Sequence, residues 1–176
     1  MTQAYGITPD TKDWTWVLER PCPECGFVAA TMDPLAVGAA VRASLPRWRE
    51  ALTRPDVQRR PSPQVWSTLE YSAHVRDVFQ LFDRRLALML AEDDPVFANW
   101  DQDATAAAER YGEQDPATVS TELTEAGERV AASFDALGTD QLDRTGSRSD
   151  GARFTVASFG RYFLHDVVHH LHDIRA

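Results

Sequence analysis

The sequence lacks features that mark several classes of protein. It contains two cysteines, Cys22 and Cys25, which are too few to staple a secreted fold with disulfides. No apolar run approaches the roughly 20 residues that cross a bilayer. The first residues do not place an apolar stretch after a basic one, as a signal peptide would. We therefore expect a cytoplasmic protein with no membrane partner.

Positive charge is also scarce. Lysine and arginine together number 18 against 27 aspartates and glutamates, which gives a formal net charge of -9. A chain this acidic repels phosphate backbones, and this argues against nucleic acid as a partner. Hydrophobic residues make up 43% of the 176 positions, enough for one domain with a real core.

Four segments have the pattern of amphipathic helices, with apolar residues at spacings of three or four. The first and third begin with a capping aspartate before a proline, at Asp33-Pro34 and Asp115-Pro116. The second begins with a capping box from Ser67 to Glu70. The predicted helices cover about residues 33–53, 67–92, 115–138 and 155–176.

Three local signals refine these predictions. Pro46 lies inside the first helical segment and is expected to kink or split it. Gly138 is placed to close the third helix as a C-terminal glycine. The weak alternation of residues 14–18 suggests a short strand, and the polar segment 139–153 is expected to be a loop.

Together these segments predict an all-α fold, a four-helix bundle over residues 33–176 with long crossover connections. The connections are residues 54–66 and 96–114, and the alanine-rich middle of the second is expected to be locally helical. Residues 1–32 are predicted to be a short irregular N-terminal extension that carries the two cysteines.

Histidine is distributed unevenly. One of the five lies on the second predicted helix, and four fall within the last twelve residues: His74, then His165, His169, His170 and His172. Residues four apart on a helix share a face and can share an ion, and a bundle supplies further ligands from a facing helix. The last helix offers two such pairs, His165 with His169 and Asp166 with His170.

Helix phase discriminates between the pairs. At about 100° per residue, Asp166 and His170 point roughly 100° from the centre of the apolar stripe, while His165 and His169 point roughly 155° away. His74 lies roughly 80° from the centre of its own stripe. We therefore predict a metal site of His74, Asp166 and His170, with His165 and His169 as the alternative pair.

Two imidazoles and one carboxylate suit zinc and would also accept nickel, iron or manganese. A simpler interpretation is that the histidines form a solvated face or act as cations near the helix C-terminus.

The segment from Cys22 to Cys25 has three interpretations. It supplies two zinc ligands, and His165 with His169 could complete a Cys₂His₂ site if the N-terminal segment folds over that face. It could be a redox dithiol, although no thioredoxin-like pattern surrounds it. The third interpretation is a tight turn with small, part-buried cysteines.

The motifs on the second and last helices resemble those of the DinB/YfiT-like superfamily. The resemblance rests on Trp66-Ser67 and His74, and on the segment from His165 to Ile174. It spans about residues 33–176. It implies a four-helix bundle with a metal triad, one ligand from the second helix and two from the last. Asp166 stands where many members have histidine or glutamate.

The resemblance implies a metal-dependent S-transferase or isomerase that uses a low-molecular-weight thiol. With Lys12 as its one lysine, the chain resembles a high-GC actinobacterial protein, and such organisms use mycothiol. We therefore expect a divalent metal, most simply zinc, with mycothiol as co-substrate and a small electrophile as partner.

The metal-bound thiol would be activated as a thiolate. Asp173 is expected to orient a ligand histidine, and Arg148, Arg153 and Arg161 are candidates to bind the substrate. Two alternatives remain: a non-catalytic metal-binding stress or damage-response protein of the same fold, as a monomer or homodimer, and a thiol-redox module.

Overall fold

A bundle of helices forms the body of the protein in the computed structural model, which describes residues 6–9 and 12–176. The described α-helices are α1 (Val37–Ala51), α2 (Thr68–Ala91), α3 (Gln102–Ala108), α4 (Pro116–Asp135) and α5 (Val156–Asp173). The strands are β1 (Val96–Phe97), β2 (Thr145–Arg148) and β3 (Arg153–Thr155). Short 3₁₀ turns are η1 (Thr15–Leu18), η2 (Ala29–Thr31), η3 (Pro34–Ala36), η4 (Tyr111–Glu113) and η5 (Thr139–Gln141).

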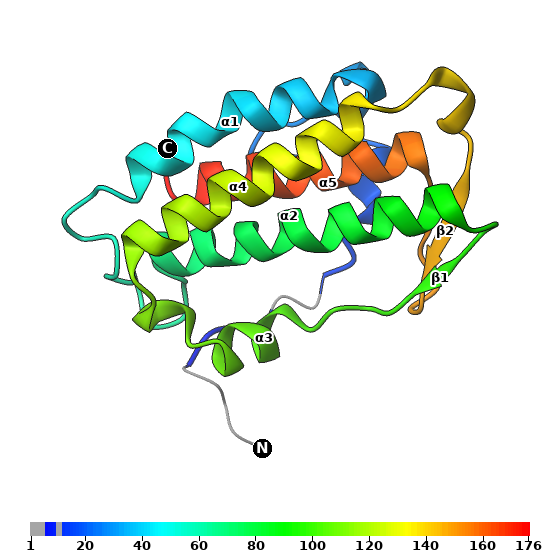
Figure 1. The fold of residues 1–176 in the computed structure, drawn as a ribbon. Helices are drawn as coiled ribbons and strands as arrows, with labels where there is room; N and C mark the ends of the chain where they lie inside the picture. Colours follow the sequence, from blue (N-terminus) through cyan, green and yellow to red (C-terminus); the bar gives the residue numbers. More distant parts are fainter. Residues whose placement is uncertain (1–5, 10–11) are drawn as a thin grey trace.

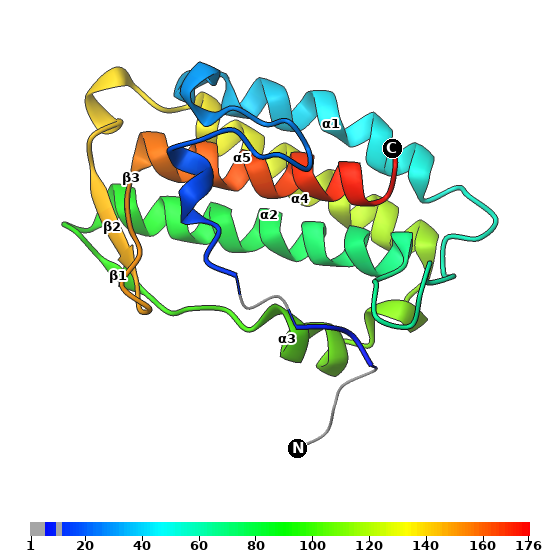
Figure 2. The same cartoon turned by 180° about the vertical axis from the view of Figure 1, so that it is seen from behind.

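The four long helices α1, α2, α4 and α5 lie side by side, and α3 lies outside them in the connection between α2 and α4 (Figures 1 and 2). α4 packs against both α1 and α2, and α5 packs against α1 and α2. The predicted four-helix bundle with a long crossover is therefore confirmed, and so is the local helix in the alanine-rich connection.

The helices begin where side chains can satisfy the free backbone N–H groups. Asp33 accepts a hydrogen bond from the Leu35 amide, and Asp115 accepts one from Thr118. Ser67 begins α2 with a complete capping box, in which Glu70 bonds back to the Ser67 amide. α5 begins in the same way, with Thr155 as its cap.

Close packing holds the helices at fixed positions. The rings of Phe134 and Phe163 stack with centroids 5.4 Å apart, joining α4 to α5. Gly127 on α4 admits no side chain, because an added Cβ would lie 2.5 Å from Leu45 and 3.0 Å from Phe79. This glycine lets α4 approach α1 and α2 closely.

Four local predictions were wrong. α1 is not split at Pro46: it continues from Val37 to Ala51, with Leu45 and Trp48 buried on either side of the proline. α4 ends at Asp135, and Gly138 instead precedes η5 with a negative φ. Residues 15–18 form η1 rather than a strand, since Asp13 accepts a hydrogen bond from the Thr15 amide and turns the chain.

The fourth correction concerns residues 139–153, predicted to be a loop. This segment contains β2 and the start of β3, which pair antiparallel with Gly146 opposite Phe154. β1, from the far end of α2, joins β2 in parallel with Val96 opposite Ser147. The small sheet closes one end of the bundle.

The N-terminal extension packs along α5 (Figure 2). Val17, Cys22 and Ala29 are each 2% exposed or less. Nε of Arg161 on α5 donates to the Met32 carbonyl at 2.9 Å. Within the described residues, no helix combines the length and the apolar character that a membrane span requires.

Candidate metal centre

A cavity of about 430 Å³ lies between α2, α5, the connection after α2 and the N-terminal extension. His74, Asp166 and His170 all contribute to its wall. A volume of this size falls within the range typical of small-molecule sites. The three predicted metal ligands are therefore beside a space that could admit a substrate.

His74 occupies this wall as a buried, unpartnered imidazole. It is 1% exposed, and neither ring nitrogen has a hydrogen-bond partner among the described residues. Trp100 stacks flat on the ring at 5.3 Å, and Trp66 lies 5.2 Å away. Burial lowers the pKa of His74, which favours the neutral form that binds metals.

Asp166 and His170 face His74 from α5. Asp166 Oδ2 lies 3.8 Å from His74 Nε2, and Asp166 Oδ1 lies 3.2 Å from His170 Nε2. One donor atom from each of the three residues lies within 4.8 Å of the others. The helical offset of four residues places both α5 side chains on the face that meets His74.

Asp173 fixes the orientation of His170. Its Oδ2 lies 2.8 Å from His170 Nδ1, which donates, so Nε2 faces Asp166 and His74. Burial lowers the pKa of His170, but the charges of Asp166 and Asp173 outweigh it and raise the value to about 9. Burial likewise opposes ionisation of Asp166, yet His170 and His74 hold its pKa well below the usual range.

These three residues fit a divalent metal. Two imidazoles and one carboxylate form a ligand set found in catalytic zinc sites, which leave one position for water or substrate. A buried imidazole with two unpartnered nitrogens is costly unless something binds it, and a metal ion would remove one of these unmet bonds. A carboxylate on the second nitrogen of a ligand histidine, as Asp173 provides, is a usual partner in such sites.

The three candidate arginines lie in different places. Arg148 lines the cavity, where it is paired with Asp150 and donates to the Tyr162 hydroxyl. The Arg153 side chain is 65% exposed and pairs with Asp94. Arg161 contacts the N-terminal extension through the Met32 carbonyl. Of the three, Arg148 is the one whose position suits a role in the cavity.

Arg85 also lines the cavity, and the sequence reasoning missed it. It is 7% exposed, donates to the Ala98 carbonyl at 2.6 Å, and lies over the Phe97 ring. Burial, assisted by the charge of Arg148, lowers its pKa to about 10. The signal in the sequence was an arginine within the apolar stripe of the second helix, between Phe82 and Leu86.

His165 and His169 do not form a solvated face, as one interpretation of the sequence suggested. They are 3% and 6% exposed, because the N-terminal extension covers them. Cys22, Cys25 and these two histidines bring one donor atom each within 4.8 Å of one another. The pair is thus close to the cysteines and on a different face of α5 from the triad.

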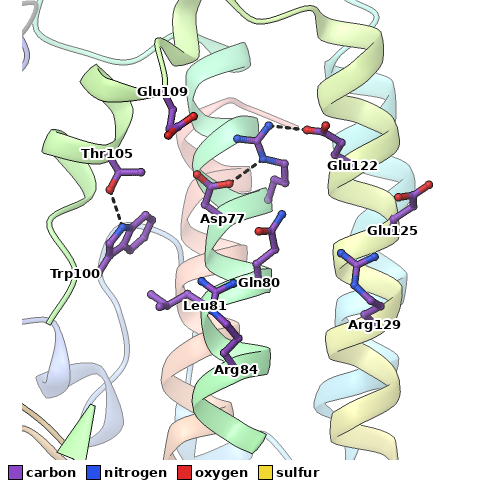
Figure 3. A pocket seen from close by; sticks show the side chains of 11 residues that line it. Asp77, Gln80, Leu81, Arg84, Trp100, Thr105, Glu109, Glu122, Glu125 and Arg129 are labelled. Atoms are coloured by element: carbon purple, nitrogen blue, oxygen red, sulfur yellow. Dashed lines mark hydrogen bonds and ion pairs between the residues drawn. The ribbon is translucent and has the colours of Figure 1, made fainter. Parts of the chain in front are cut away.

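A second cavity, of about 480 Å³, lies between α2, α3 and α4 (Figure 3). Its buried Arg76 is already paired with Asp77 at 2.8 Å and Glu122 at 2.7 Å. The described residues that line it include neither histidine nor cysteine. The candidate ligands His74, Asp166 and His170 line the smaller of these two cavities.

Comparisons with known proteins by sequence and by structure point to the same fold. The sequence model of the DinB superfamily matches residues 39–174. Among solved structures, YfiT from Bacillus subtilis aligns with a TM-score of 0.67 and 21% sequence identity, over 96% of this chain and 92% of YfiT. That protein is described as a probable metal-dependent hydrolase with an unusual four-helix bundle topology. The search of curated proteins returned no match.

Proposed function

Because the chain belongs to the DinB superfamily, we propose that it is a divalent-metal-dependent S-transferase that couples a low-molecular-weight thiol, mycothiol, to an electrophile. The observation that carries the proposal is the position of His74. Its buried, unpartnered imidazole faces Asp166 and His170 at the wall of a cavity large enough for a small molecule.

In this proposal His74, Asp166 and His170 hold the ion, and Asp173 keeps the His170 ring in place. A divalent ion with an open position favours the thiolate over the thiol and so makes the sulfur nucleophilic near neutral pH. Zinc is the simplest choice for the ion.

The cavity wall offers a surface for each substrate. Gln64, Asn99 and Gln102 present amide groups that can bond the hydroxyl and amide groups of a polar thiol. Val78, Leu81 and Phe82 provide an apolar surface for an electrophile.

Arg85 and Arg148 place positive charge beside the apolar side chains and suit an electrophile that carries a carboxylate. The walls therefore support a reaction between a hydrophilic thiol and a smaller anionic or polarised electrophile.

Metal content tests the site. The protein is purified without chelator, and its metal is measured beside that of His74→Ala and the control His172→Ala. His172 is an exposed histidine on α5, the helix that carries Asp166 and His170. We expect His74→Ala to lose one metal ion per chain and His172→Ala to keep it. Full retention of metal by His74→Ala would contradict the proposed site.

Activity tests the reaction. The metal-loaded protein is incubated with mycothiol and a panel of bimane, chloroarene, epoxide and maleyl-type electrophiles, and loss of free thiol is followed. We expect thiol-dependent adduct formation that His74→Ala lacks and His172→Ala retains.

Two other results would replace the proposal. Product formation that needs metal but no thiol would favour a hydrolase, as suggested for YfiT. Bound metal with no turnover across the panel would favour a non-catalytic metal-binding protein of the same fold.

A further inference from the structure

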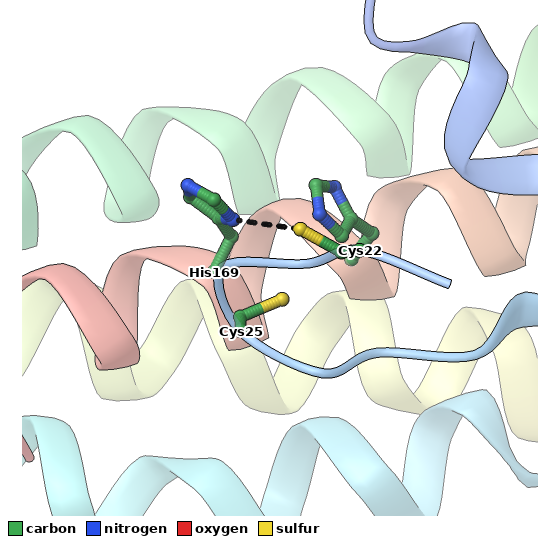
Figure 4. A group of neighbouring side chains, drawn as sticks. Cys22, Cys25 and His169 are labelled. Atoms are coloured by element: carbon green, nitrogen blue, oxygen red, sulfur yellow. Dashed lines mark hydrogen bonds between the residues drawn. The ribbon is translucent and has the colours of Figure 1, made fainter. Parts of the chain in front are cut away.

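A second group of metal-binding side chains lies beneath the N-terminal extension, outside the proposed triad. The turn between η1 and η2 supplies Cys22 and Cys25, and α5 supplies His165 and His169. Figure 4 shows the side chains of Cys22, Cys25 and His169 pointing toward one another, across the gap between the turn and the helix. The triad uses none of these four residues.

The turn is shaped to present both sulfurs to the helix. The Gly26 amide donates to the Cys22 carbonyl at 2.9 Å, and the Cys22 amide donates to the Phe27 carbonyl at 2.9 Å. Gly26 has a φ of +75°, a conformation that side chains rarely adopt. The tight reversal keeps the two cysteines, three residues apart, on one side of the turn.

The distances suit a four-coordinate ion. With metal–sulfur bonds of about 2.3 Å and metal–nitrogen bonds of about 2.0 Å, neighbouring donors in a tetrahedral site lie about 3.3 to 3.8 Å apart. Cys22 Sγ lies 3.6 Å from His169 Nδ1, within that range. The four donor atoms all lie within 4.8 Å of one another, so modest side-chain movement brings them to bonding distance.

The surroundings of the two histidines also suit metal ligands. His165 is 3% exposed, and its Nε2 has no hydrogen-bond partner among the described residues. His169 directs Nδ1 to Cys22, and its Nε2 lies 3.5 Å from Glu24 Oε2 and 3.8 Å from Asp173 Oδ1. Carboxylates in that position orient the second nitrogen of a ligand histidine.

We propose that Cys22, Cys25, His165 and His169 bind one zinc ion in a closed structural site that fastens the N-terminal extension to α5. Two thiolates balance the charge of the zinc ion, and two neutral imidazoles complete a site with no net charge. That neutrality suits a place as buried as this one. Binding releases the two thiol protons to solvent, with no change of oxidation state.

The site has a consequence for the cavity. Trp14, which precedes the cysteine turn, and Glu24, which lies within it, line the same cavity as the triad. Trp14 packs against both histidines, with ring centroids 5.5 Å from His165 and 4.9 Å from His169. The zinc ion would therefore hold one wall of the substrate cavity in place.

Cobalt substitution tests the proposal on the full chain. Thiolate ligands give cobalt(II) intense near-ultraviolet charge-transfer absorption, which the imidazoles and carboxylate of the triad cannot give. The metal-free, reduced protein is titrated with cobalt(II), and stoichiometry and spectrum are recorded. We expect the charge-transfer band in the wild type and in His74→Ala, and its loss in the Cys22→Ser/Cys25→Ser double variant with one cobalt fewer per chain.

A second pair of variants distinguishes this site from a dithiol that binds metal by itself. His165→Ala/His169→Ala should weaken cobalt binding and alter the band, whereas His172→Ala should leave both unchanged. An unaltered band in His165→Ala/His169→Ala would overturn the Cys₂His₂ assignment. The assignment would also be overturned if the cobalt-saturated wild type lacked the charge-transfer band while both cysteines were shown to be reduced.

Release of zinc by a mercurial tests the proposal on the wild-type protein, without any variant. A thiol-specific mercurial added to the native zinc protein should release one zinc ion per chain, detected with a colorimetric chelator. Release of none would overturn the proposal. A wild type that shows the band but binds only one ion would instead contradict the triad, so failures of the two proposals are distinguishable.

Discussion

The two faces of α5 carry ligand pairs that differ by a single residue in register. Asp166 and His170 face α2 and meet His74 beside a cavity, while His165 and His169 face the N-terminal extension and meet two cysteines. The first group has three donors and space beside it. The second has four donors and a covering segment. Three ligands with an open position are typical of reactive zinc, and four closed ligands of structural zinc.

Under the two proposals, the chemistry of the ligands separates two uses of one metal. Both histidine pairs of α5 border the same cavity, but sulfur ligands come from the segment that covers His165 and His169, and the carboxylate belongs to the triad. A site with two thiolates has no charge left to attract a further anionic ligand. A site with one carboxylate keeps a net positive charge that can bind a thiolate.

The largest expected effect is on stability, at the closed site. Cys22→Ser should remove the ion that ties the N-terminal extension to α5. Where free zinc exceeds its dissociation constant a thousandfold, this would lower the free energy of unfolding by about 4 kcal/mol. Chemical unfolding of the wild type and of Cys22→Ser, with and without chelator, measures this difference in the free energy of unfolding.

The same variant should expose residues 12–32 to limited proteolysis. Wild type treated with chelator should match Cys22→Ser, and His74→Ala should keep an intact N-terminal extension. Equal protease sensitivity of all three proteins would contradict the division of roles between the two sites.

A smaller effect is expected at the open site from Asp173→Asn. The asparagine can still accept from His170 Nδ1 but carries no charge, so the imidazole becomes a weaker ligand. Loss of such a partner typically costs about 10- to 100-fold in metal affinity. Competition with a fluorescent zinc chelator gives the constant. Asp140→Asn, a change in η5 away from both ligand groups, serves as the control, and equal affinities would argue against the role of Asp173.

The smallest effect is expected from Arg148→Gln, which removes positive charge from the cavity wall and leaves every proposed ligand in place. For an electrophile with a carboxylate, KM should rise about tenfold, equivalent to about 1.4 kcal/mol. Arg153→Gln is the matched control, since Arg153 is exposed and pairs with Asp94. A similar rise of KM in both variants would argue against a role of Arg148 in substrate binding. So would a rise of KM that is the same for electrophiles with and without a carboxylate.

Features encoded within a few residues were predictable. Asp33, Ser67 and Asp115 each begin a helix as expected, because an N-cap bonds only to amides two or three residues away. The pairing of His74 with Asp166 and His170 was predicted from helix phase and the family pattern. The structure brings one donor atom of each residue within 4.8 Å of the others.

Features that depend on distant contacts were not predictable. β1 and β2 pair across about fifty residues, and neither is long enough to show an alternating pattern. The same limit applies to His165 and His169. Helix phase predicted that they point away from the apolar stripe, but no local signal indicated that residues 12–32 would cover them.

Asp173 has contacts on both faces of α5. One carboxylate oxygen bonds to His170 at 2.8 Å, and the other lies 3.8 Å from His169. A charge gained by either imidazole would therefore act on the same carboxylate, and under the two proposals filling one centre would change the affinity of the other. Thermodynamic linkage makes that influence equal in both directions. Binding of zinc at the closed site would thus be coupled to binding at the open site. The two ions would bind with positive or negative cooperativity, not independently.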